Sequence, residues 1–547
     1  MQQEMRVYAA VMPGSYRKGD IRHIYTVEIF RENNAMILKE TYFTMSDGIR
    51  LYTRMVLPEE NGKFPVVFIR TPYEEKRNGR PYPVENYQND LFIQNGYAVV
   101  LQHTRGRGDS EGSCRPYEER QDGLDTLAII RTLPFYNGEI YITGGSYLST
   151  VHLCYLDTNP QDIKAAALSI QTDRMYFRNY RNGCCYDFCN LSWWLGMLQN
   201  RYPEQRPYQE ALVRPYEKIM ERAVGEDVPE YTGMLLHDTY DDFWKNHENT
   251  YAADTLNIPT LFMEGWYDFY IDGMFSMWER LPEKTREKSV FVVGPWGHAT
   301  AVSPSAEYPL ANGNIPADSV VRFFNSIRDN TPCRGFEAGK VNYYSVGGDF
   351  WTTGKPETKR LKLYFNHDNT LAEEISLKGE QSYIFNPDKP LHYFRFHNIY
   401  KTEKTNAADG VLSFVSAPFR EDTDFYGKIQ WNMKVKSDCD DTAFFMRVYF
   451  MEDGISYNLT ETITTLSHVH ENYTAGEECF IRIQTPPIGF RVKKGNCIRV
   501  DISSHSDLYV PHSNTKGHWA KVTESKTAVN TVICDEDACI ELPVCGR

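Results

Sequence analysis

The chain has 547 residues, and at about 150 residues a domain this length predicts two to four domains. Hydrophobic residues make up 41% and aromatic residues 14%, a composition typical of folded proteins that excludes general disorder. Lys and Arg number 59 against 73 Asp and Glu, which gives a net charge of −14. This charge repels phosphate backbones, so we expect no nucleic acid partner.

The sequence shows no sign of a membrane span or a secretory leader. No stretch approaches the roughly 18 apolar residues that a span requires. Residues 1–31 carry charges and tyrosines throughout, without the basic-then-apolar order of a leader. Twelve cysteines are too few for a disulfide scaffold. We therefore expect a cytoplasmic protein that has no membrane partner and keeps its thiols reduced.

The first two thirds of the chain alternate between short apolar runs and helix-length segments. The run 122–133 has apolar residues at helical spacing. This alternation predicts a parallel, doubly wound α/β sheet with its ligands beyond the carboxyl ends of the strands. The predicted strands are 66–69, 98–101, 139–143, 165–169, 260–263 and 289–293.

Two other regions differ in character from this α/β pattern. Between 171 and 257 the strand signal stops, and a helical stretch around 208–223 indicates an inserted helical cap. After 355, short strands separated by turn residues predict a jelly-roll β-sandwich. The predicted organisation is an unplaced extension at 1–38, core halves at 39–170 and 258–355, a cap at 171–257 and a β domain at 356–547. The β strands are expected at 361–365, 410–415, 431–435, 443–450, 479–485 and 496–502.

Ser146 stands where the strand 139–143 turns into a helical segment. Such a strained turn requires small neighbours, which Gly144 and Gly145 supply before the serine. After the serine, Leu148 occupies the place of the second glycine in the general G-x-S-x-G motif, so Ser149 must be the small residue there. The match to the motif is imperfect, and the alternative is a glycine-rich turn with an incidental serine.

Two further strand ends each carry a residue of the right type for acyl transfer. Asp268 follows the strand 260–263, and His298 follows the strand 289–293. The chain order Ser146, Asp268, His298 is that of α/β-hydrolase catalytic triads. We therefore predict a triad in which His298 is the base and Asp268 orients it, with Asp272 as an alternative acid.

From about Thr41 to Val544 the chain resembles the serine hydrolases that include cocaine esterase, α-amino acid ester hydrolases, glutaryl acylases and Xaa-Pro dipeptidyl-peptidases. Together the motifs that carry this resemblance are highly specific. They lie at 46–51, 70–73, 104–112, 122–126, 145–147, 265–268, 294–298, 321–324, 416–418 and 499–504.

The resemblance implies an α/β-hydrolase core, an inserted helical cap and a C-terminal jelly roll. It also implies a triad of Ser146, Asp268 and His298. The oxyanion hole would use the backbone N–H of Tyr147 and the hydroxyl of Tyr73, which ends the R-T-P-Y motif. The implied partner is a small-molecule ester or amide. No cofactor and no metal is expected.

Departures from the family pattern bear on the substrate. Where amino acid ester hydrolases carry acidic residues just after the catalytic Asp, this chain has Tyr270 and Ile271. We therefore expect an uncharged, aromatic or bulky acyl group rather than one with a free α-amino group, although Asp272 or the cap residue Asp187 could supply a carboxylate. The candidate pocket residues are Trp193, Trp194, Trp266, Tyr270 and Trp296. For Trp193 and Trp194, packing inside the cap is an equal alternative.

Several questions stay open from the sequence. One alternative activity is that of an Xaa-Pro dipeptidyl-peptidase. A non-enzymatic alternative is a carbohydrate-binding protein that uses the jelly roll. Cys184, Cys185 and Cys189 form a cluster without a second ligand set at matching spacing, so thiols are favoured over a zinc site. Homo-oligomerisation is also undecided.

Overall fold

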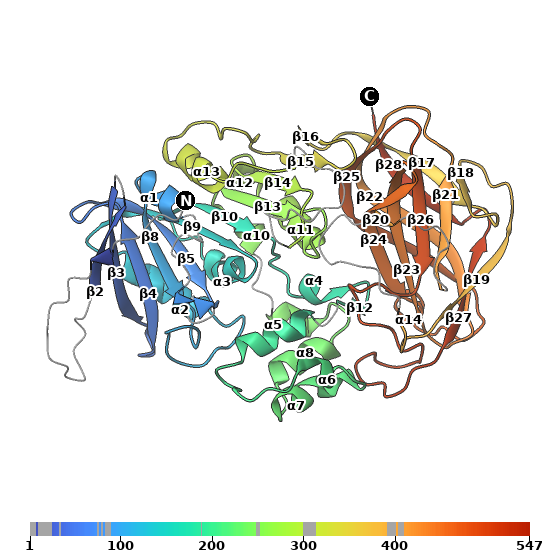
Figure 1. Cartoon of the computed structure of the whole chain (residues 1–547), viewed down its shortest axis with the longest axis horizontal. Helices are drawn as coiled ribbons and strands as arrows, with labels where there is room; N and C mark the ends of the chain where they lie inside the picture. Colours follow the sequence, from blue (N-terminus) through green and yellow to red (C-terminus); the bar gives the residue numbers. More distant parts are fainter. Residues whose placement is uncertain are drawn as a thin grey trace.

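The computed structural model describes residues 34–73, 89–186, 189–247, 252–298, 313–390 and 410–546, with short strand segments at 7–8, 25–31, 76–77, 80–81 and 401–402. Figure 1 shows an α/β layer, a group of short helices below it and a β domain at the C-terminal side. The predicted α/β core with a C-terminal β domain is confirmed. No helix among the described residues is both long and apolar enough to cross a bilayer.

A twelve-stranded sheet forms the core of the first part. Its central strands run parallel from β8 to β15, because helices cross over between them. All six strands predicted from apolar runs are present. In spatial order the strands from β4 are β4 (Arg50–Leu57), β8 (Ala98–His103), β5 (Phe64–Thr71), β9 (Tyr136–Gly145), β10 (Ile163–Ser169), β13 (Thr260–Gly265), β14 (Val290–Gly294) and β15 (Val341–Ser345).

Antiparallel strands extend both edges of this sheet. At one edge β3 (Asn34–Thr44) pairs with β4, β2 (Tyr25–Arg31) pairs with β3, and β1 (Val7–Tyr8) pairs with β2. At the other edge β16 (Phe350–Thr353) pairs with β15. Parts of the segment 1–38, which the sequence leaves unplaced, therefore join the core sheet.

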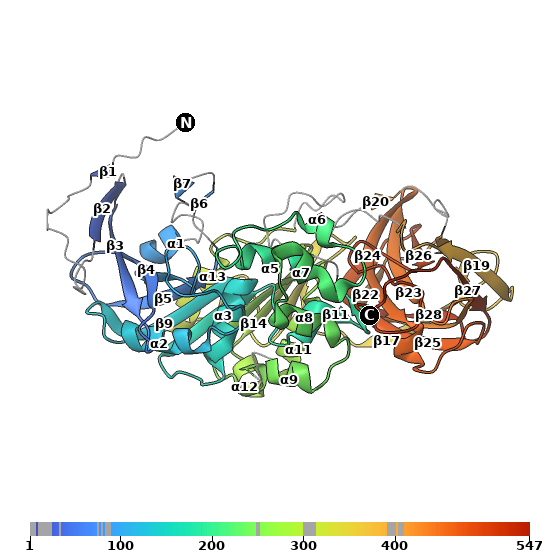
Figure 2. The ribbon, with the colours of Figure 1, turned by 90° about the horizontal axis from the view of Figure 1, so that it is seen from below.

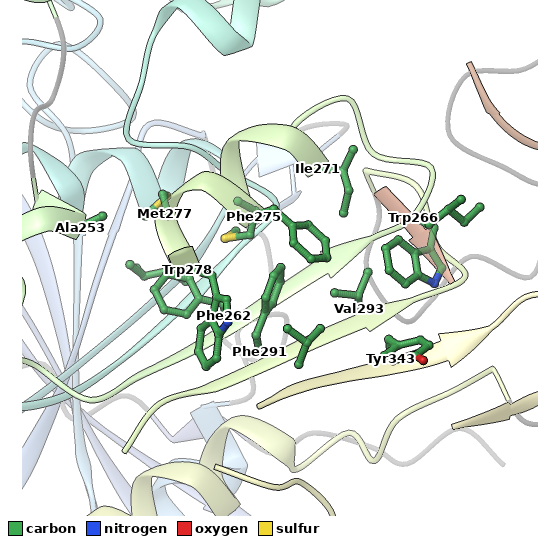
Figure 3. Close-up of a cluster of buried hydrophobic side chains, with 14 of the residues drawn as sticks. Ala253, Phe262, Trp266, Ile271, Phe275, Met277, Trp278, Phe291, Val293 and Tyr343 are labelled. Atoms are coloured by element: carbon green, nitrogen blue, oxygen red, sulfur yellow. The ribbon is translucent and has the colours of Figure 1, made fainter. Parts of the chain in front are cut away.

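Helices cover both faces of the sheet. On one face lie α2 (Arg120–Ile130), α3 (Tyr147–Leu156) and α11 (Ile271–Arg280), whose apolar side chains share one buried cluster. Figure 3 shows α11 placing Phe275 and Trp278 over Phe291 of β14, with ring centroids 4.9 and 5.7 Å apart. The opposite face is covered by α1 (Asn89–Gln94) and α13 (Ser319–Arg328). The strands β13 and β14, which are followed by the candidate residues Asp268 and His298, are thus held in a packed core.

Between β10 and β13 the chain forms the helical insertion. Its core contains Trp194 and Trp244, which are almost completely buried. The stretch predicted as helical around 208–223 is α6, a 3₁₀ turn at Tyr216–Lys218, and α7, because Pro215 interrupts the helical hydrogen bonding. The helices are α4 (Tyr176–Asn179), α5 (Cys189–Met197), α6 (Tyr208–Ala211), α7 (Ile219–Val224), α8 (Pro229–Leu236), α9 (Asp242–His247) and α10 (Ala252–Thr255).

The C-terminal part is a β domain, and each strand expected there is present. Its longest pairing joins β22 to β25, where Phe425 stacks on Phe490 at 4.5 Å. The insertion contacts this domain, since the Val510 N–H donates to the Cys185 carbonyl over 3.0 Å. The main strands are β17 (Thr358–Phe365), β19 (Gly379–Phe385), β21 (Leu412–Ser416), β22 (Thr423–Ser437), β23 (Ala443–Glu452), β24 (Ile455–Thr465), β25 (Cys479–Val492), β26 (Cys497–Ser503), β27 (Ala528–Cys534) and β28 (Cys539–Cys545). Figure 2 shows this domain at the opposite end of the molecule from β1–β3.

Candidate active site

Ser146 occupies a strained turn between β9 and α3. Its φ of 54° and ψ of −126° lie in a region that non-glycine residues seldom adopt. The Ser146 N–H donates to the Ser169 carbonyl at the end of β10 over 2.9 Å, which holds the turn against the sheet. This geometry presents the serine hydroxyl beyond the carboxyl ends of the strands, as the strand-to-helix motif predicts.

The small residues around this turn have separate roles. A Cβ atom on Gly144 would lie 2.4 Å from the Leu148 carbonyl oxygen, so this position excludes any side chain. Ser149 is completely buried, and its hydroxyl donates to the Gly144 carbonyl at 2.6 Å and accepts from the Ser169 N–H at 3.1 Å. Ser149 thus replaces the expected glycine by bridging the ends of β9 and β10.

Ser146, His298 and Asp268 form a continuous chain of hydrogen bonds. Ser146 Oγ lies 2.9 Å from His298 Nε2, and His298 Nδ1 lies 2.8 Å from Asp268 Oδ2. Asp268 is 2% exposed, and its second oxygen accepts the Tyr270 N–H over 2.8 Å. Such an arrangement can pass the serine proton to the imidazole while the carboxylate fixes the orientation of the ring.

The surroundings of His298 change the pKa of its imidazole. Burial lowers the pKa of its imidazole, but the charge of Asp268 and the hydrogen bond to it outweigh burial and raise the pKa above its usual value. Two aromatic rings enclose the imidazole. Phe269 stacks on it at 5.0 Å, and Tyr270 meets it edge-on at 5.5 Å. Sequence reasoning missed Phe269, although it directly follows the G-W-Y-D motif.

Asp272, the alternative acid, forms ion pairs with cationic side chains of two other elements. Its carboxylate lies 3.0 Å from the Arg181 guanidinium of the insertion and 3.6 Å from the Lys428 ammonium of the β domain. The structure therefore brings Asp268, and not Asp272, to the imidazole. Asp187, the other carboxylate considered, lies outside the described residues.

The two expected oxyanion donors, Tyr147 and Tyr73, both lie next to Ser146. Tyr147 is the first residue of α3, so its N–H has no acceptor within the helix. Tyr73 follows β5, and its hydroxyl accepts the Trp193 indole N–H over 3.3 Å. Burial raises the pKa of Tyr73, whereas its contacts with Trp193 and Ser146 oppose the rise. Tyr73 therefore lies within reach of the Ser146 hydroxyl.

The Tyr147 side chain is anchored in the core by Glu119. Its hydroxyl donates to Glu119 Oε1 over 2.5 Å and accepts the Tyr117 N–H over 2.7 Å. Burial raises the pKa of Glu119 to about 7, against the effects of the Tyr147 hydrogen bond and of Arg70. The residue next to the candidate nucleophile is thus fixed from both ends, by α3 and by a buried carboxyl group.

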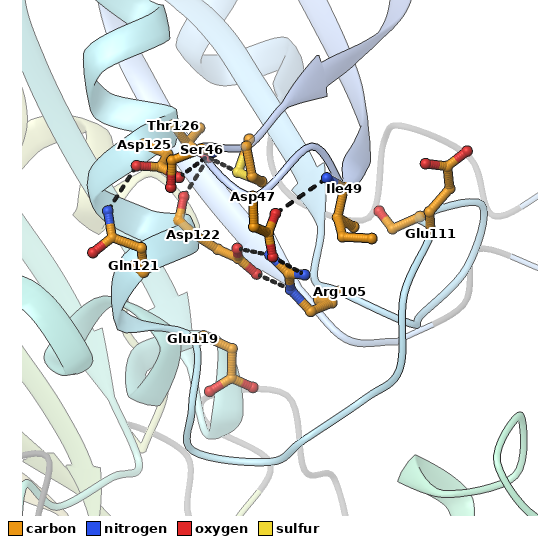
Figure 4. Close-up of polar contacts among 12 residues, drawn as sticks. Ser46, Asp47, Ile49, Arg105, Glu111, Glu119, Gln121, Asp122, Asp125 and Thr126 are labelled. Carbon is orange, nitrogen blue, oxygen red and sulfur yellow. Dashed lines mark hydrogen bonds and ion pairs between the residues drawn. The ribbon is translucent and has the colours of Figure 1, made fainter.

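Polar contacts among the motif residues hold the loops beneath the site. Figure 4 shows Arg105, which donates two hydrogen bonds to Asp122 at the start of α2 and one to Asp47 over 2.6 Å. The Ser46 N–H donates to Asp125 Oδ2 over 2.7 Å. These contacts join three of the sequence motifs, at 46–51, 104–112 and 122–126.

The predicted pocket aromatics separate into two groups. Trp193 and Tyr270 lie at the site, in contact with Tyr147 at 4.8 Å and with His298, respectively. The other three are almost completely buried and belong to hydrophobic clusters: Trp194 in the insertion, and Trp266 and Trp296 in the α/β core. The indole N–H groups of Trp266 and Trp296 donate to the Tyr344 and Gly313 carbonyls. These three indoles pack the interior instead of lining the site.

Among the described residues, no group of three or more His, Cys, Asp or Glu side chains is placed so that it could hold a metal ion. Cys184 and Cys185 are buried, and burial raises the thiol pKa of Cys184. The side chain of Cys189 lies outside the described residues.

Glu264, at the end of β13, is a completely buried carboxyl group near the site. Its Oε1 accepts the Gly265 N–H over 2.9 Å, and its Oε2 is buried without a hydrogen-bond partner. Burial and the nearby charge of Asp268 raise the pKa of Glu264 well above its usual value. The folded protein therefore binds a proton here that the unfolded chain, with a pKa of about 4.3, releases at neutral pH.

We expect Glu264→Gln to stabilise the protein at neutral pH. Because the folded-state pKa is raised, the free energy of unfolding of the wild type falls as pH rises above about 4.3, and a neutral glutamine removes this dependence. Urea unfolding between pH 5 and 8 measures the slope of the free energy of unfolding against pH. The matched control is exposed Glu60→Gln, which should keep the wild-type slope. An unchanged slope in Glu264→Gln would contradict the prediction.

Comparisons with known proteins place the chain among hydrolases. Residues 47–300 match the family model described as X-Pro dipeptidyl-peptidase (S15 family), and residues 341–538 match that of the X-Pro dipeptidyl-peptidase C-terminal non-catalytic domain. The cocaine esterase of Rhodococcus sp. (strain MB1 Bresler) is 24% identical over 562 residues, which cover 92% of this chain and 97% of that protein.

Solved structures show the same fold. An α-amino acid ester hydrolase superimposes with a TM-score of 0.79 at 19% identity, covering 93% of this chain and 96% of that one. An aminopeptidase from a marine sediment Thaumarchaeota archaeon gives 0.78 at 18% identity, covering 98% and 99%. A CocE/NonD family hydrolase from Staphylococcus aureus gives 0.68 at 18% identity, covering 97% and 99%. At these identities the likeness concerns the fold.

Proposed function

Because the chain belongs to the family of cocaine esterases and X-Pro dipeptidyl-peptidases, whose members are hydrolases, we propose that it is a serine hydrolase of carboxylic esters or amides. The observation that carries this proposal is the hydrogen-bonded chain from Ser146 Oγ through His298 to Asp268, with distances of 2.9 and 2.8 Å. A strained serine turn, an enclosed imidazole and a buried carboxylate together match the requirements of nucleophilic acyl transfer.

In the proposed reaction, Ser146 Oγ attacks the carbonyl carbon of the substrate, and its proton moves to His298 Nε2. The carbonyl oxygen becomes negative and accepts hydrogen bonds from the Tyr147 N–H and the Tyr73 hydroxyl. Collapse of this intermediate breaks the ester or amide bond, and His298 gives its proton to the leaving group. Water, activated by the same imidazole, then hydrolyses the acyl-enzyme and regenerates Ser146.

A fluorophosphonate probe tests the proposal, because it reacts with activated serines. We expect mass spectrometry to find a single label, on Ser146, together with turnover of p-nitrophenyl acyl esters. A label on another serine would assign the role of nucleophile to that serine. Absence of both label and turnover would favour the non-enzymatic alternative, carbohydrate binding by the β domain, which binding to immobilised glycans would then test.

Replacing Tyr73 by phenylalanine should lower kcat by a factor of about 10²–10³, the usual effect of losing one oxyanion donor. The ring and its packing remain, so fluorophosphonate labelling of Ser146 and the melting temperature should change little. Steady-state kinetics with a p-nitrophenyl ester measure the effect. An unchanged kcat would assign the second donor to another group.

The surroundings of the triad support an uncharged acyl group as substrate. Phe269, Tyr270 and Trp193 supply aromatic surface beside His298 and Tyr147. The carboxylate of Asp272, which could have bound an ammonium group, is already neutralised by Arg181 and Lys428. A buried ammonium without a paired carboxylate is costly to desolvate, whereas an aromatic acyl group gains from burial.

A phenylacetyl or benzoyl ester should therefore show a higher kcat/KM than the matching α-amino ester. Comparison of the two esters with the same leaving group measures this preference directly. Xaa-Pro anilides, tested in parallel, examine the dipeptidyl-peptidase alternative. A preference of tenfold or more for the amino ester would contradict the prediction and indicate a carboxylate that binds the ammonium group, with Asp187 as the first candidate to replace.

A further inference from the structure

The helix α5 of the insertion is joined to the loop that carries Tyr73 directly by Trp193 and indirectly through Arg107. Near the middle of the helix, the Trp193 indole N–H donates to the Tyr73 hydroxyl over 3.3 Å. At its end, the Arg107 guanidinium donates to the Gly196 and Met197 carbonyls over 3.0 and 3.1 Å. The same guanidinium donates to the carbonyl of Pro72, the residue before Tyr73, over 2.7 Å.

The chemistry of the Trp193 contact leaves the Tyr73 proton available. An indole can only donate a hydrogen bond, while a phenolic hydroxyl has one proton to donate and lone pairs that accept. Tyr73 therefore uses a lone pair toward Trp193, and its own proton must point elsewhere. An acceptor in place of the indole would instead consume that proton. The Ser146 hydroxyl lies within reach of Tyr73, so this proton is available to an acceptor at the reaction centre.

Trp193 is itself held in place by neighbouring rings of the core and of the insertion. Its indole packs on Tyr147 at 4.8 Å, on Tyr117 at 5.9 Å and on Trp194 at 5.8 Å. Tyr147 is in turn fixed through its hydroxyl by Glu119. One indole thus touches the side chains of both residues that carry the oxyanion donors.

Arg107 fixes the helix relative to the loop. It is 7% exposed and bonds three carbonyl groups, two of which lie at the C-terminal end of α5. The negative end of a helix dipole attracts a cation, so the guanidinium is favoured there. Any movement of α5 away from the core would break these bonds together with the Trp193 contact.

We propose that Trp193 is a positioning residue for Tyr73, so that the insertion completes the oxyanion hole, with Arg107 clamping α5 to the Tyr73 loop. This inference rests on the proposed serine hydrolase function. It assigns to the insertion a role in kcat as well as in substrate selection, because Trp193 acts through Tyr73 on the transition state.

The test is a double-mutant cycle between Trp193→Phe and Tyr73→Phe, measured as kcat and KM for a p-nitrophenyl ester. Trp193→Phe keeps a ring but removes the N–H, and we expect kcat to fall about tenfold, the usual scale of one lost hydrogen bond. KM should stay within about twofold. In the Tyr73→Phe background the same change should have almost no further effect on kcat, since the group it positions is gone.

The matched control is Trp244→Phe, the same substitution in the core of the insertion, where the indole N–H donates to the His237 carbonyl over 2.7 Å instead of to Tyr73. It should leave kcat within about twofold, and melting temperatures should verify that all variants fold. Arg107→Met, as a second variant, should lower kcat in the same direction by releasing α5.

Three outcomes would overturn the inference. If Trp193→Phe keeps the wild-type kcat, Trp193 does not position Tyr73. If Trp193→Phe lowers kcat by the same factor in the wild type and in the Tyr73→Phe background, Trp193 acts by a route that does not include Tyr73. If Tyr73→Phe alone leaves kcat unchanged, Tyr73 is not an oxyanion donor, and the inference about Trp193 fails as well. Fluorophosphonate labelling of Ser146 in the same samples separates that failure from a failure of the serine hydrolase function itself.

Discussion

Replacing Ser146 by alanine is expected to lower kcat by a factor of about 10⁶, the largest effect of any single substitution considered. In the proposed reaction the hydroxyl oxygen forms the acyl-enzyme, and alanine has no nucleophilic atom to take its place at this strained turn. The Gly144 and Ser149 contacts that hold the turn do not involve this hydroxyl. The fold and the melting temperature should therefore be retained.

The control for this prediction is Ser149→Ala, three residues along the same segment. Its hydroxyl bonds the Gly144 carbonyl and the Ser169 N–H, so we expect a lower melting temperature but continued labelling by the fluorophosphonate probe. Burst kinetics of p-nitrophenol release would measure acylation in both variants. Residual activity above about 1% in Ser146→Ala, with no contaminating hydrolase, would contradict the assignment.

Much of the fold could be predicted because its central strands are buried on both faces. In β5 and β14, for example, almost every side chain is buried, and such strands appear as continuous apolar runs. The strands β2 and β3 could not be placed in this way. They lie at an antiparallel edge, and residues such as Glu28 and Glu40 interrupt any apolar run. Their assignment depends on pairing with β4, which one sequence does not reveal.

The residues of the candidate triad could be located because each follows a strand. The carboxyl ends of parallel strands meet at one edge, and Ser146, Asp268 and His298 keep the chain order that brings them together there. Residue type and position sufficed for these three. For Asp272 the sequence could not distinguish a triad acid from an ion-pair partner, because its partners Arg181 and Lys428 are 91 and 156 residues away.

The surroundings of the triad were harder to predict than the triad itself. Trp193 and Trp194 are adjacent and chemically identical, yet only Trp193 reaches Tyr73, since neighbouring residues on a helix face in different directions. Arg107 lies in the 104–112 motif, but its contacts could not be predicted, because its acceptors are backbone carbonyls, which every residue has. Contacts of this kind depend on the docking of the insertion onto the core.

Asp268→Asn should lower kcat by about 10⁴, because an amide no longer holds the imidazole in the tautomer that accepts the serine proton. It should also shift the pH profile. In the proposed mechanism the wild-type protein needs neutral His298, so kcat/KM should fall as pH drops through the pKa of His298, which Asp268 raises above its usual value of about 6.5. Without that carboxylate the pKa falls, and the acidic limb of the residual activity should move to lower pH.

The matched control for this change is Asp272→Asn, four residues along the same segment. Its carboxylate pairs with Arg181 and Lys428 and does not touch His298, so the acidic limb should stay where it is, although loss of a partner for buried Arg181 should lower the melting temperature. Profiles of kcat/KM from pH 5 to 9 for the three proteins decide between the two carboxylates. If Asp272→Asn moves the limb and Asp268→Asn does not, the orienting acid is Asp272, and the 2.8 Å contact of Asp268 with the imidazole is structural only.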